Sequence, residues 1–374
     1  MPTGQQIFSN ISSDGQLEFS MVEVDVPKPG PGHVLVKMEA APVNPSDMWP
    51  MFGPADLSKA ELEYSDKRRV MTAPVHKSML PIVKARLDQA LPVGNEGAGT
   101  VIEAGEGAQD LLGKTVALMS GSCYAEYCVV PAMACLPFNE GTTAEQAASS
   151  FVNPLTALSM VDTMRLEGHT ALVHTAAASN LGQMLNKICI AEGVALVNIV
   201  RKQEQVDVLQ DLGAKHIVNS SSETYYQDLF AAIDETGATI AFDATGGGQL
   251  ANDILMTMER VLSKDVKGLN TYGSEQLKQV YLYGGLDVSP TTLNRGYGMC
   301  WAVGGYLLPH FLKRVGMERA GELRQRVADE INTTFASHYT KTLSLKELMT
   351  PEIASTYVAK HTGEKYLVNP SKDL

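Results

Sequence analysis

The sequence predicts an α/β protein with a β-rich domain and a doubly wound parallel sheet. Up to residue 142, short runs rich in β-branched residues alternate with turns that contain glycine and proline, which is typical of β structure. From residue 143 onward, patterns of buried strands alternate with helical patterns, and repeated βα units imply a parallel sheet. A chain of 374 residues is long enough for two such cores.

In the first region, the strand patterns cover residues 18–26, 34–43, 92–105, 113–119 and 123–130. Residues 51–90 differ, because they are charged and carry a helical pattern at 79–87. We interpret this segment as an insert. It is either a solvated excursion or a lid over a pocket.

The second region begins with a helix whose N-cap is Thr142 or Thr143. After residue 312 we expect a long amphipathic helix, and we expect residues 357–368 to return to the β-rich domain as a hairpin. The predicted strands of this region cover residues 171–175, 194–200, 215–219, 238–244 and 279–284. The predicted domains are therefore 1–149 with 312–374, and 150–311.

Composition excludes several classes of partner. The net charge of −12 argues against nucleic acid, whose phosphates would be repelled, and no apolar run is long enough to span a membrane. The five cysteines are odd in number and form no C-x-x-C pair, which favours reduced thiols. With no signal peptide apparent at the N-terminus, we expect a cytoplasmic protein.

Residues 171–201 read as a buried strand, a turn of small residues, a helix and a second buried strand. In the turn, Ala177, Ser179 and Gly182 stand where a G-x-G-x-x-G motif has its glycines, with Asn180 and Leu181 between them. Small residues there let backbone N–H groups and a helix N-terminus approach a pyrophosphate. The turn is therefore a predicted cofactor site, although the literal glycine pattern is absent.

Several stretches together resemble the medium-chain dehydrogenase/reductase superfamily, and within it the zinc-free quinone oxidoreductase-like and enoyl reductase-like branch. The resemblance implies a GroES-like β-rich catalytic domain, a Rossmann-type cofactor domain inserted into it, and an active cleft between them. The chain departs from the family at residues 51–90 and 262–278. The stretches that carry the resemblance are residues 43–47, 94–101, 124–127, 153–157, 175–182, 212–218 and 242–246.

The branches of this superfamily differ in whether they use zinc. Asn44 and Asn95 stand where zinc-using relatives have a Cys and a His, and asparagine is not a usual zinc ligand. The cysteine cluster of a structural zinc site is also missing. We therefore expect no metal, which makes alcohol oxidation less favourable and reduction of an activated double bond more favourable.

The predicted cofactor is NADPH. The strand at 194–200 is followed by Arg201 and Lys202 instead of a ribose-binding acid, and a guanidinium suits a 2′-phosphate. The alternative is a solvated cation at a sheet edge, and Lys187 is likewise either a second phosphate contact or a solvated lysine. Turns at two other strand ends are further cofactor candidates, which are Thr245, Gly246, Gly247, Tyr283 and Gly284.

The resemblance implies that Asn44 and Thr156 face the nicotinamide and the substrate. From the residues alone, Asn44 could instead form an Asx-turn and Thr156 could be an ordinary helical threonine. Tyr64 and Trp49 either line a substrate pocket or pack against the domain. Glu96, which matches a family position, and Asp47 are expected to fix the loop near Asn44.

The expected protein is a zinc-independent, NADPH-dependent reductase that transfers a hydride to a quinone, an enone or an enoyl thioester. The alternatives are a zinc-type alcohol dehydrogenase and a non-catalytic NADPH-binding sensor or interaction protein. The resemblance also implies a homodimer that pairs edge strands, for which residues 281–284 and 301–308 are the candidates.

Overall fold

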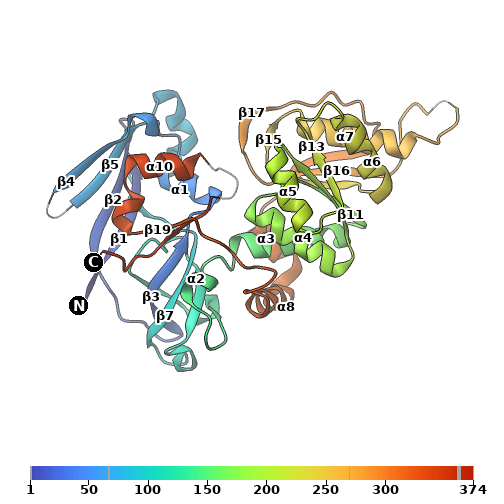
Figure 1. Cartoon of the computed structure of the whole chain (residues 1–374). Coiled ribbons are helices and arrows are strands. Elements are labelled where there is room, and N and C mark those ends of the chain that lie inside the picture. The colour runs from blue at the N-terminus through green and yellow to red at the C-terminus, as the bar shows by residue number, and fades with distance from the viewer. Residues whose placement is uncertain (1, 66–67, 269, 360–363, 374) are drawn as a thin grey trace. The chain divides into compact units, whose positions relative to one another are not determined.

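The computed structural model describes residues 2–65, 68–268, 270–359 and 364–373. The chain forms two compact units (Figure 1). Unit 1 is Met1–Val152 with Arg324–Leu374, and unit 2 is Asn153–Leu323.

Unit 1 contains a five-stranded sheet in the order β4-β5-β2-β1-β6. The described part of residues 51–90 contributes β4 and β5 to this sheet, and the pairing of β5 with β2 places Val70, Met71 and Ala73 in the core. The interpretation of this part as a solvated excursion is therefore wrong. The expected helix at 79–87 is a 3-10 stretch, Lys77–Arg86, in which Pro81 has no N–H to donate to a regular helix. The strands are β1 Thr3–Ile11, β2 Gln16–Asp25, β4 Glu61–Ser65, β5 Arg68–Pro74 and β6 Leu91–Pro92.

A seven-stranded sheet completes the β structure of unit 1, and its backbones approach closely. A Cβ atom on Gly99 of β7 would lie 1.9 Å from the carbonyl oxygen of Lys37 on β3, so only glycine fits there. The two sheets share one hydrophobic core, which includes Ile7, Phe19 and Met38. The strands are β3 His33–Pro42, β7 Glu96–Ala104, β8 Thr115–Met119, β9 Tyr127–Pro131, β10 Leu136–Pro137, β19 Lys341–Leu343 and β20 Tyr366–Val368.

The C-terminal tail returns to unit 1, but not as a hairpin. β20 pairs antiparallel with β3 and parallel with β19, whereas a hairpin would need antiparallel neighbours in sequence. The start of the expected hairpin lies in a helix, α10, and residues 360–363 lie outside the described part. The short helices of unit 1 are η1 Pro45–Asp47, α1 Met48–Phe52, η2 Leu57–Lys59, η4 Gln109–Leu111, η5 Ala132–Ala134, α2 Ala144–Ala147, α9 Leu345–Leu348 and α10 Pro351–Val358.

Unit 2 contains a six-stranded, all-parallel sheet in the order β13-β12-β11-β14-β16-β18, which confirms the predicted doubly wound fold. The strand order reverses between β11 and β14, where such sheets bind ligands at the carboxyl ends of their strands. The strands are β11 Ala171–Thr175, β12 Ala195–Val200, β13 His216–Asn219, β14 Ile240–Asp243, β16 Lys278–Leu282 and β18 Trp301–Gly305. The main helices are α3 Val152–Leu166, α4 Asn180–Glu192, α5 Gln203–Asp211, α6 Tyr225–Thr236 and α7 Leu250–Ser263.

The boundary at which the chain returns from unit 2 to unit 1 lies later in the sequence than predicted. The helix α8, Leu308–Asp329, is broken at Gly316, whose φ of 81° is not helical. Beyond this break Arg319 still pairs with Asp162 of α3 at 2.8 Å, so α8 belongs with unit 2 up to Leu323. The units therefore divide after Leu323 and not at residue 311.

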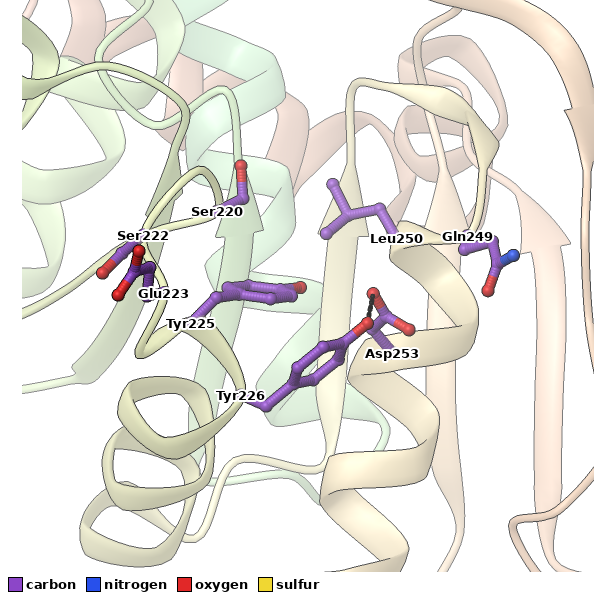
Figure 2. Close-up of a pocket in the computed structure, with 8 residues that line it drawn as sticks. All are labelled: Ser220, Ser222, Glu223, Tyr225, Tyr226, Gln249, Leu250 and Asp253. Carbon is purple, nitrogen blue, oxygen red and sulfur yellow. Dashed lines mark hydrogen bonds between the residues drawn. The ribbon is translucent and has the colours of Figure 1, made fainter.

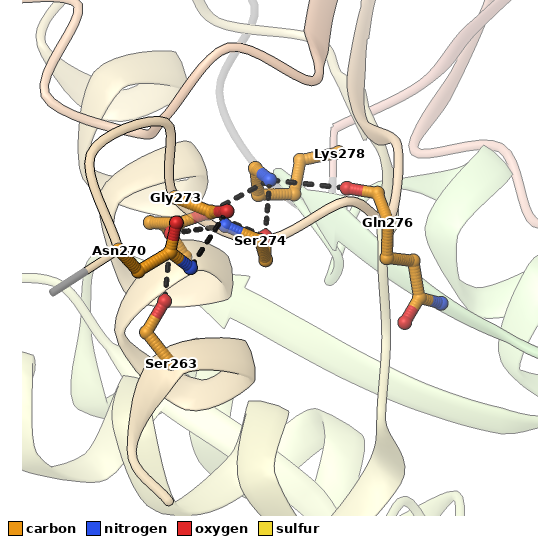
Figure 3. A network of polar contacts seen from close by, with 7 residues as sticks. Ser263, Asn270, Gly273, Ser274, Gln276 and Lys278 are labelled. Atoms are coloured by element: carbon orange, nitrogen blue, oxygen red, sulfur yellow. Dashed lines mark hydrogen bonds and ion pairs between the residues drawn. The ribbon is translucent and has the colours of Figure 1, made fainter. Parts of the chain in front are cut away.

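The stretch at 262–278, which departs from the family, is anchored by a buried ion pair. The Lys278 Nζ lies 2.8 Å from Oε2 of Glu259 on α7. It also donates to the Ser274 hydroxyl at 2.6 Å and to the Gln276 carbonyl at 3.0 Å (Figure 3). These contacts satisfy all three ammonium protons of a lysine that has no exposed surface. Among the helices of the described residues, none is long and apolar enough to cross a membrane.

Candidate functional site

The turn after β11 forms a close-packed entrance to α4. Ser179 is the N-cap of α4 and accepts a hydrogen bond from the Gly182 N–H at 3.2 Å. A Cβ atom on Gly182 would lie 2.2 Å from the carbonyl oxygen of Ala177, so only glycine fits at this position. Ala177 has no exposed surface and packs under the turn. The first turn of α4 can thus present its N–H groups to an anion.

Two cations follow β12 at the same edge of the sheet. The backbone N–H groups of Arg201 and Lys202 both donate to the Gln205 side chain, at 2.9 and 3.1 Å, which fixes the chain against the first turn of α5. Their side chains are exposed. Lys187 lies on α4 and is partly buried.

A buried carboxylate joins the ends of β11 and β14. Asp243 Oδ1 accepts hydrogen bonds from the Thr175 hydroxyl at 2.6 Å and from the Thr245 N–H at 2.8 Å. Its Oδ2 accepts from the Gly246 N–H at 3.1 Å, and the Thr175 hydroxyl in turn accepts from the Ala244 N–H at 2.8 Å. This network shapes the point where the strand order reverses.

Backbone packing explains the glycines of the neighbouring turns. A Cβ atom on Gly246 would lie 2.6 Å from the Gly284 carbonyl oxygen, and one on Gly284 would lie 2.4 Å from that of Ala244. One on Gly247 would lie 2.5 Å from the Ser289 carbonyl oxygen, because β15, Gly246–Gly248, pairs with β17, Asp287–Thr291. The chain itself fills the space beside these three glycines. Their contact with a cofactor stays a prediction.

Tyr283 is held by a buried histidine. Its hydroxyl lies 2.7 Å from the His174 Nε2, and the two rings are stacked with centroids 5.7 Å apart. Burial raises the pKa of Tyr283 and lowers the pKa of His174 to about 3. Both groups are therefore neutral at pH 7, and Tyr283 is fixed against β11.

A hollow of about 410 Å³ opens after the carboxyl end of β13, beside the first turns of α6 and α7 (Figure 2). The Tyr225 hydroxyl is buried and has no hydrogen-bond partner in the described part of the chain. The ring of Tyr226 lies 4.8 Å from that of Tyr225, and its hydroxyl lies 3.5 Å from Asp253 Oδ2. Aromatic rings beside hydroxyl and carboxylate groups suit a planar polar ligand such as a nucleobase. The hollow is lined by Ser220, Ser222, Glu223, Tyr225, Tyr226, Gln249, Leu250 and Asp253.

In unit 1, Asn44 lies between two buried carboxylates. Its backbone N–H donates to Asp47 Oδ2 and its Nδ2 donates to Glu96 Oε1, each at 2.8 Å. The other oxygen of Glu96 accepts from the N–H groups of Phe151 at 2.8 Å and Val152 at 3.0 Å, where α3 begins. The Asn44 Oδ1 atom is buried without a hydrogen-bond partner in the described part of the chain. The alternative that Asn44 forms an Asx-turn is therefore not what the structure shows.

Asp47 holds the second asparagine of this region. Its Oδ1 accepts from the Asn95 N–H at 2.8 Å, while the Asn95 Nδ2 donates to the Ser46 hydroxyl at 3.0 Å. Burial is the largest influence on the pKa of Asp47. It raises the pKa to about 7, against the lowering effect of the Asn44 and Asn95 N–H groups. Asp47 and Glu96 thus fix the loop that carries Asn44 and Asn95.

The sequence and the fold of this chain are similar to those of known oxidoreductases. Residues 30–145 match the model of the alcohol dehydrogenase GroES-like domain. A solved structure of a proposed NADPH:quinone reductase from Mesorhizobium loti is 25% identical with a TM-score of 0.72, covering 99% of both chains. Both findings support the medium-chain dehydrogenase/reductase superfamily for this chain.

Curated relatives point to one branch of this superfamily. The mitochondrial enoyl-[acyl-carrier-protein] reductase of Caenorhabditis elegans is 24% identical over 65% of this chain and 64% of its own length. The human synaptic vesicle membrane protein VAT-1 homolog is 27% identical over 66% of this chain and 56% of its own length. The matches thus span less than two thirds of either relative. Together with the quinone reductase structure, they support the quinone oxidoreductase- and enoyl reductase-like branch for this chain.

The predicted site residues are divided between the two units. The turn residues and Arg201 lie at one edge of the unit 2 sheet, with Thr156 buried on α3. Asn44 lies in unit 1, and Tyr64 is 70% exposed on the edge strand β4, under the guanidinium of Arg69. The roles of these residues stay predictions.

Several residues of these sites are not among those predicted from the sequence. The pair Thr175 and Asp243 had a signal, because a buried strand that ends in an acid is unusual unless the acid has a hydrogen-bonding role. The tyrosines of the hollow had none, because they lie in a helix whose pattern reads as an ordinary surface helix.

Proposed function

We propose that this protein is a reductase that uses NADPH and transfers a hydride to a quinone or to an activated C=C bond of an enone or enoyl thioester. The observation that carries the proposal is the turn at Gly182. The close packing of this turn brings the N-terminus of α4 to the carboxyl edge of the sheet, where its N–H groups can bind an anion.

The residues of unit 2 fit a dinucleotide. The first turn of α4 offers N–H groups for a pyrophosphate, and Arg201 is exposed at the adjacent strand end to receive a 2′-phosphate. The hollow beside Tyr225 offers an unpaired hydroxyl and aromatic surface for the base. When bound, the nicotinamide ring supplies the hydride that the protein's own side chains do not carry.

The test is stopped-flow oxidation of NADPH with benzoquinone, an enone and crotonyl thioester as separate acceptors. Turnover with one of them supports the proposal and names the substrate class. Absence of turnover with all three would refute it, and tight NADPH binding under those conditions would support the alternative of a non-catalytic binding protein.

We also propose that the reaction is independent of zinc. Asn44 and Asn95 stand where zinc-using relatives have a Cys and a His, and an asparagine amide is not a usual zinc ligand. Elemental analysis that finds stoichiometric zinc in active protein would refute this and favour the alcohol dehydrogenase alternative.

A homodimer that pairs β18 strands is proposed from the sheet order. β18 is an edge strand of the six-stranded sheet, with Trp301 and Val303 only partly buried, and an unpaired edge favours pairing with another chain. Light scattering of the purified protein tests this, and a monomer would refute it.

A further inference from the structure

We propose that Asp253 and Tyr225 determine which nucleobase this protein accepts, by selecting a purine with a 6-amino group, as in adenine, over one with a 6-oxo group. The inference rests on the proposed function and deepens it, because the base of the dinucleotide is proposed to lie in the hollow beside Tyr225. It depends on three observations in unit 2, which are the unpaired hydroxyl of Tyr225, the long hydrogen bonds of Asp253 and the charge of the hollow.

The hydroxyl of Tyr225 is buried without a partner. Tyr225 is the first residue of α6 and is only 7% exposed, and its hydroxyl has no hydrogen-bond partner in the described part of the chain. Figure 2 shows this hydroxyl directed from α6 toward the start of α7. Burial raises the pKa of Tyr225, so the hydroxyl is protonated at pH 7 and can donate. A ligand atom with a lone pair would satisfy this donor, which is costly to leave unpaired.

Asp253 lies in the first turn of α7 and lines the same hollow. The hydrogen bonds found for its carboxylate among the described residues are long, from the Tyr226 hydroxyl to Oδ2 and from the Asn252 Nδ2 to Oδ1, both at 3.5 Å. A carboxylate has about four positions at which it can accept, so Asp253 can still take short hydrogen bonds from a ligand. The alternative is that Asp253 only stabilises the N-terminus of its helix.

The hollow carries negative charge. Among the described residues that line it, Glu223 and Asp253 are carboxylates and none is a lysine, arginine or histidine. Carboxylates repel a phosphate, so the hollow differs in chemistry from the predicted 2′-phosphate site at Arg201. The two sites are nevertheless adjacent, because the Ser220 N–H donates to the carbonyl of Val200, which directly precedes Arg201, at 2.8 Å. A base in the hollow would thus lie beside the phosphate that Arg201 is proposed to bind.

These groups match one edge of adenine. The 6-amino group would donate to the Asp253 carboxylate, and a ring nitrogen would accept from the Tyr225 hydroxyl. Hypoxanthine has a carbonyl oxygen in place of the amino group. That oxygen would face the Asp253 carboxylate as a second acceptor, with no proton between them. Sites that hydrogen-bond a polar group of the ligand discriminate strongly, because the wrong ligand leaves their own polar atoms unpaired.

The experiment measures base preference as a ratio of two dissociation constants. Fluorescence titration without any acceptor substrate gives the constants for NADPH and for its reduced hypoxanthine analogue. The analogue should bind the wild type about ten-fold more weakly or worse. Asp253→Asn should bring the ratio close to one, since an amide can donate to the hypoxanthine carbonyl. The matched control is Asp228→Asn, which removes an acid from the first turn of α6 outside the lining of the hollow and should keep the wild-type ratio.

The Tyr225 hydroxyl is tested first in the ligand-free protein. Tyr225→Phe should keep or raise the Tm, because it removes a buried hydroxyl that has no partner, while it weakens NADPH binding by about three- to ten-fold. The control is Tyr306→Phe. The Tyr306 hydroxyl lies 2.8 Å from that of Ser159 and 2.9 Å from that of Thr163, so its removal should lower the Tm and leave the base preference unchanged. Loss of Tm in Tyr225→Phe with unchanged NADPH affinity would contradict a ligand-binding role for Tyr225.

The outcomes separate base selection from the proposed reductase function. A ratio close to one in the wild type, or a ratio that Asp253→Asn leaves unchanged, would overturn base selection even where NADPH is oxidised. A preference for NADPH that Asp253→Asn abolishes would support base selection even where no acceptor is reduced and the reductase function fails. Binding of neither dinucleotide would overturn both.

Discussion

The hydroxyl of Thr175, the last residue of β11, donates to the carboxylate of Asp243, the last residue of β14, over 2.6 Å. The two strands lie side by side where the strand order of the sheet reverses. The bond therefore ties together the two loops between which a dinucleotide is proposed to bind.

Removal of this hydroxyl should weaken cofactor binding. Thr175→Val leaves the Ala244 N–H without a partner and removes one of the two hydrogen bonds to Asp243 Oδ1, which should destabilise the fold by about 1–3 kcal/mol and raise the dissociation constant of NADPH by about ten-fold. The matched control is Thr239→Val. Thr239 lies before the opposite end of β14, where its buried hydroxyl contacts His169. A control variant that loses as much NADPH affinity would contradict the local role of Thr175.

Gly182→Ala should disrupt the turn before α4. The added Cβ atom would lie 2.2 Å from the Ala177 carbonyl oxygen, and relief of that clash should cost about 1–3 kcal/mol of unfolding free energy and displace the N–H groups of α4. Calorimetry and NADPH titration measure both effects. The control Gly321→Ala lies in α8, where an added Cβ atom meets nothing, so it should raise the stability by about 0.5–1 kcal/mol.

Arg201→Asp should change the cofactor preference. Loss of a charged hydrogen bond to the 2′-phosphate, worth about 1.5–3 kcal/mol, should raise the KM for NADPH by about ten-fold or more and leave that for NADH less affected. The control is Lys215→Asp, an exposed cation just before the amino end of β13. An unchanged KM for NADPH in Arg201→Asp would show that the assignment of the 2′-phosphate is wrong.

Asp47 should make stability depend on pH. Its pKa is about 7 in the folded protein, against an ordinary value of 3.8 for an exposed aspartate, so its stabilising contribution is fully present below pH 3.8 and is lost as the pH rises through 7. The unfolding free energy of the wild type minus that of Asp47→Asn should therefore fall between pH 5 and 7, by at most about 1.4 kcal/mol per pH unit. Denaturant unfolding at several pH values gives this difference, and parallel curves would argue against a raised pKa.

The ion pair of Lys278 and Glu259 should be essential to unit 2. Burial opposes ionisation of Glu259, but hydrogen bonds from Lys278, Ser274 and Ser263 outweigh it and lower the pKa to about 2. The contribution is thus present above pH 4.5 and lost as the pH falls through 2. Lys278→Met should cost about 3–5 kcal/mol at pH 7, because it leaves a buried carboxylate unpaired. Lys278→Met/Glu259→Gln should recover part of this in urea unfolding, and no recovery would exclude the charge as the cause.

Local sequence determined the parallel sheet and the small-residue turn. Strands buried on both faces of a parallel sheet are typically rich in apolar residues, and residues 171–175 and 194–200 show such runs with few polar interruptions. Gly182 can also be predicted from the local sequence, because the carbonyl oxygen that excludes a Cβ atom there belongs to Ala177, five residues away. Such features depend on neighbours in the chain, so a pattern in the sequence is enough to predict them.

Tertiary structure alone decided the features that join distant segments. The pairing of β5 with β2 and of β20 with β3 depends on which strand edges are free, and periodicity does not encode that. The Asn44 amide donates to Glu96, which lies 52 residues further along the chain, and Glu96 also accepts from the N–H groups of Phe151 and Val152, 55 and 56 residues beyond it. Hydrogen bonds and charges act through space, and only the folded chain brings these groups within reach of one another.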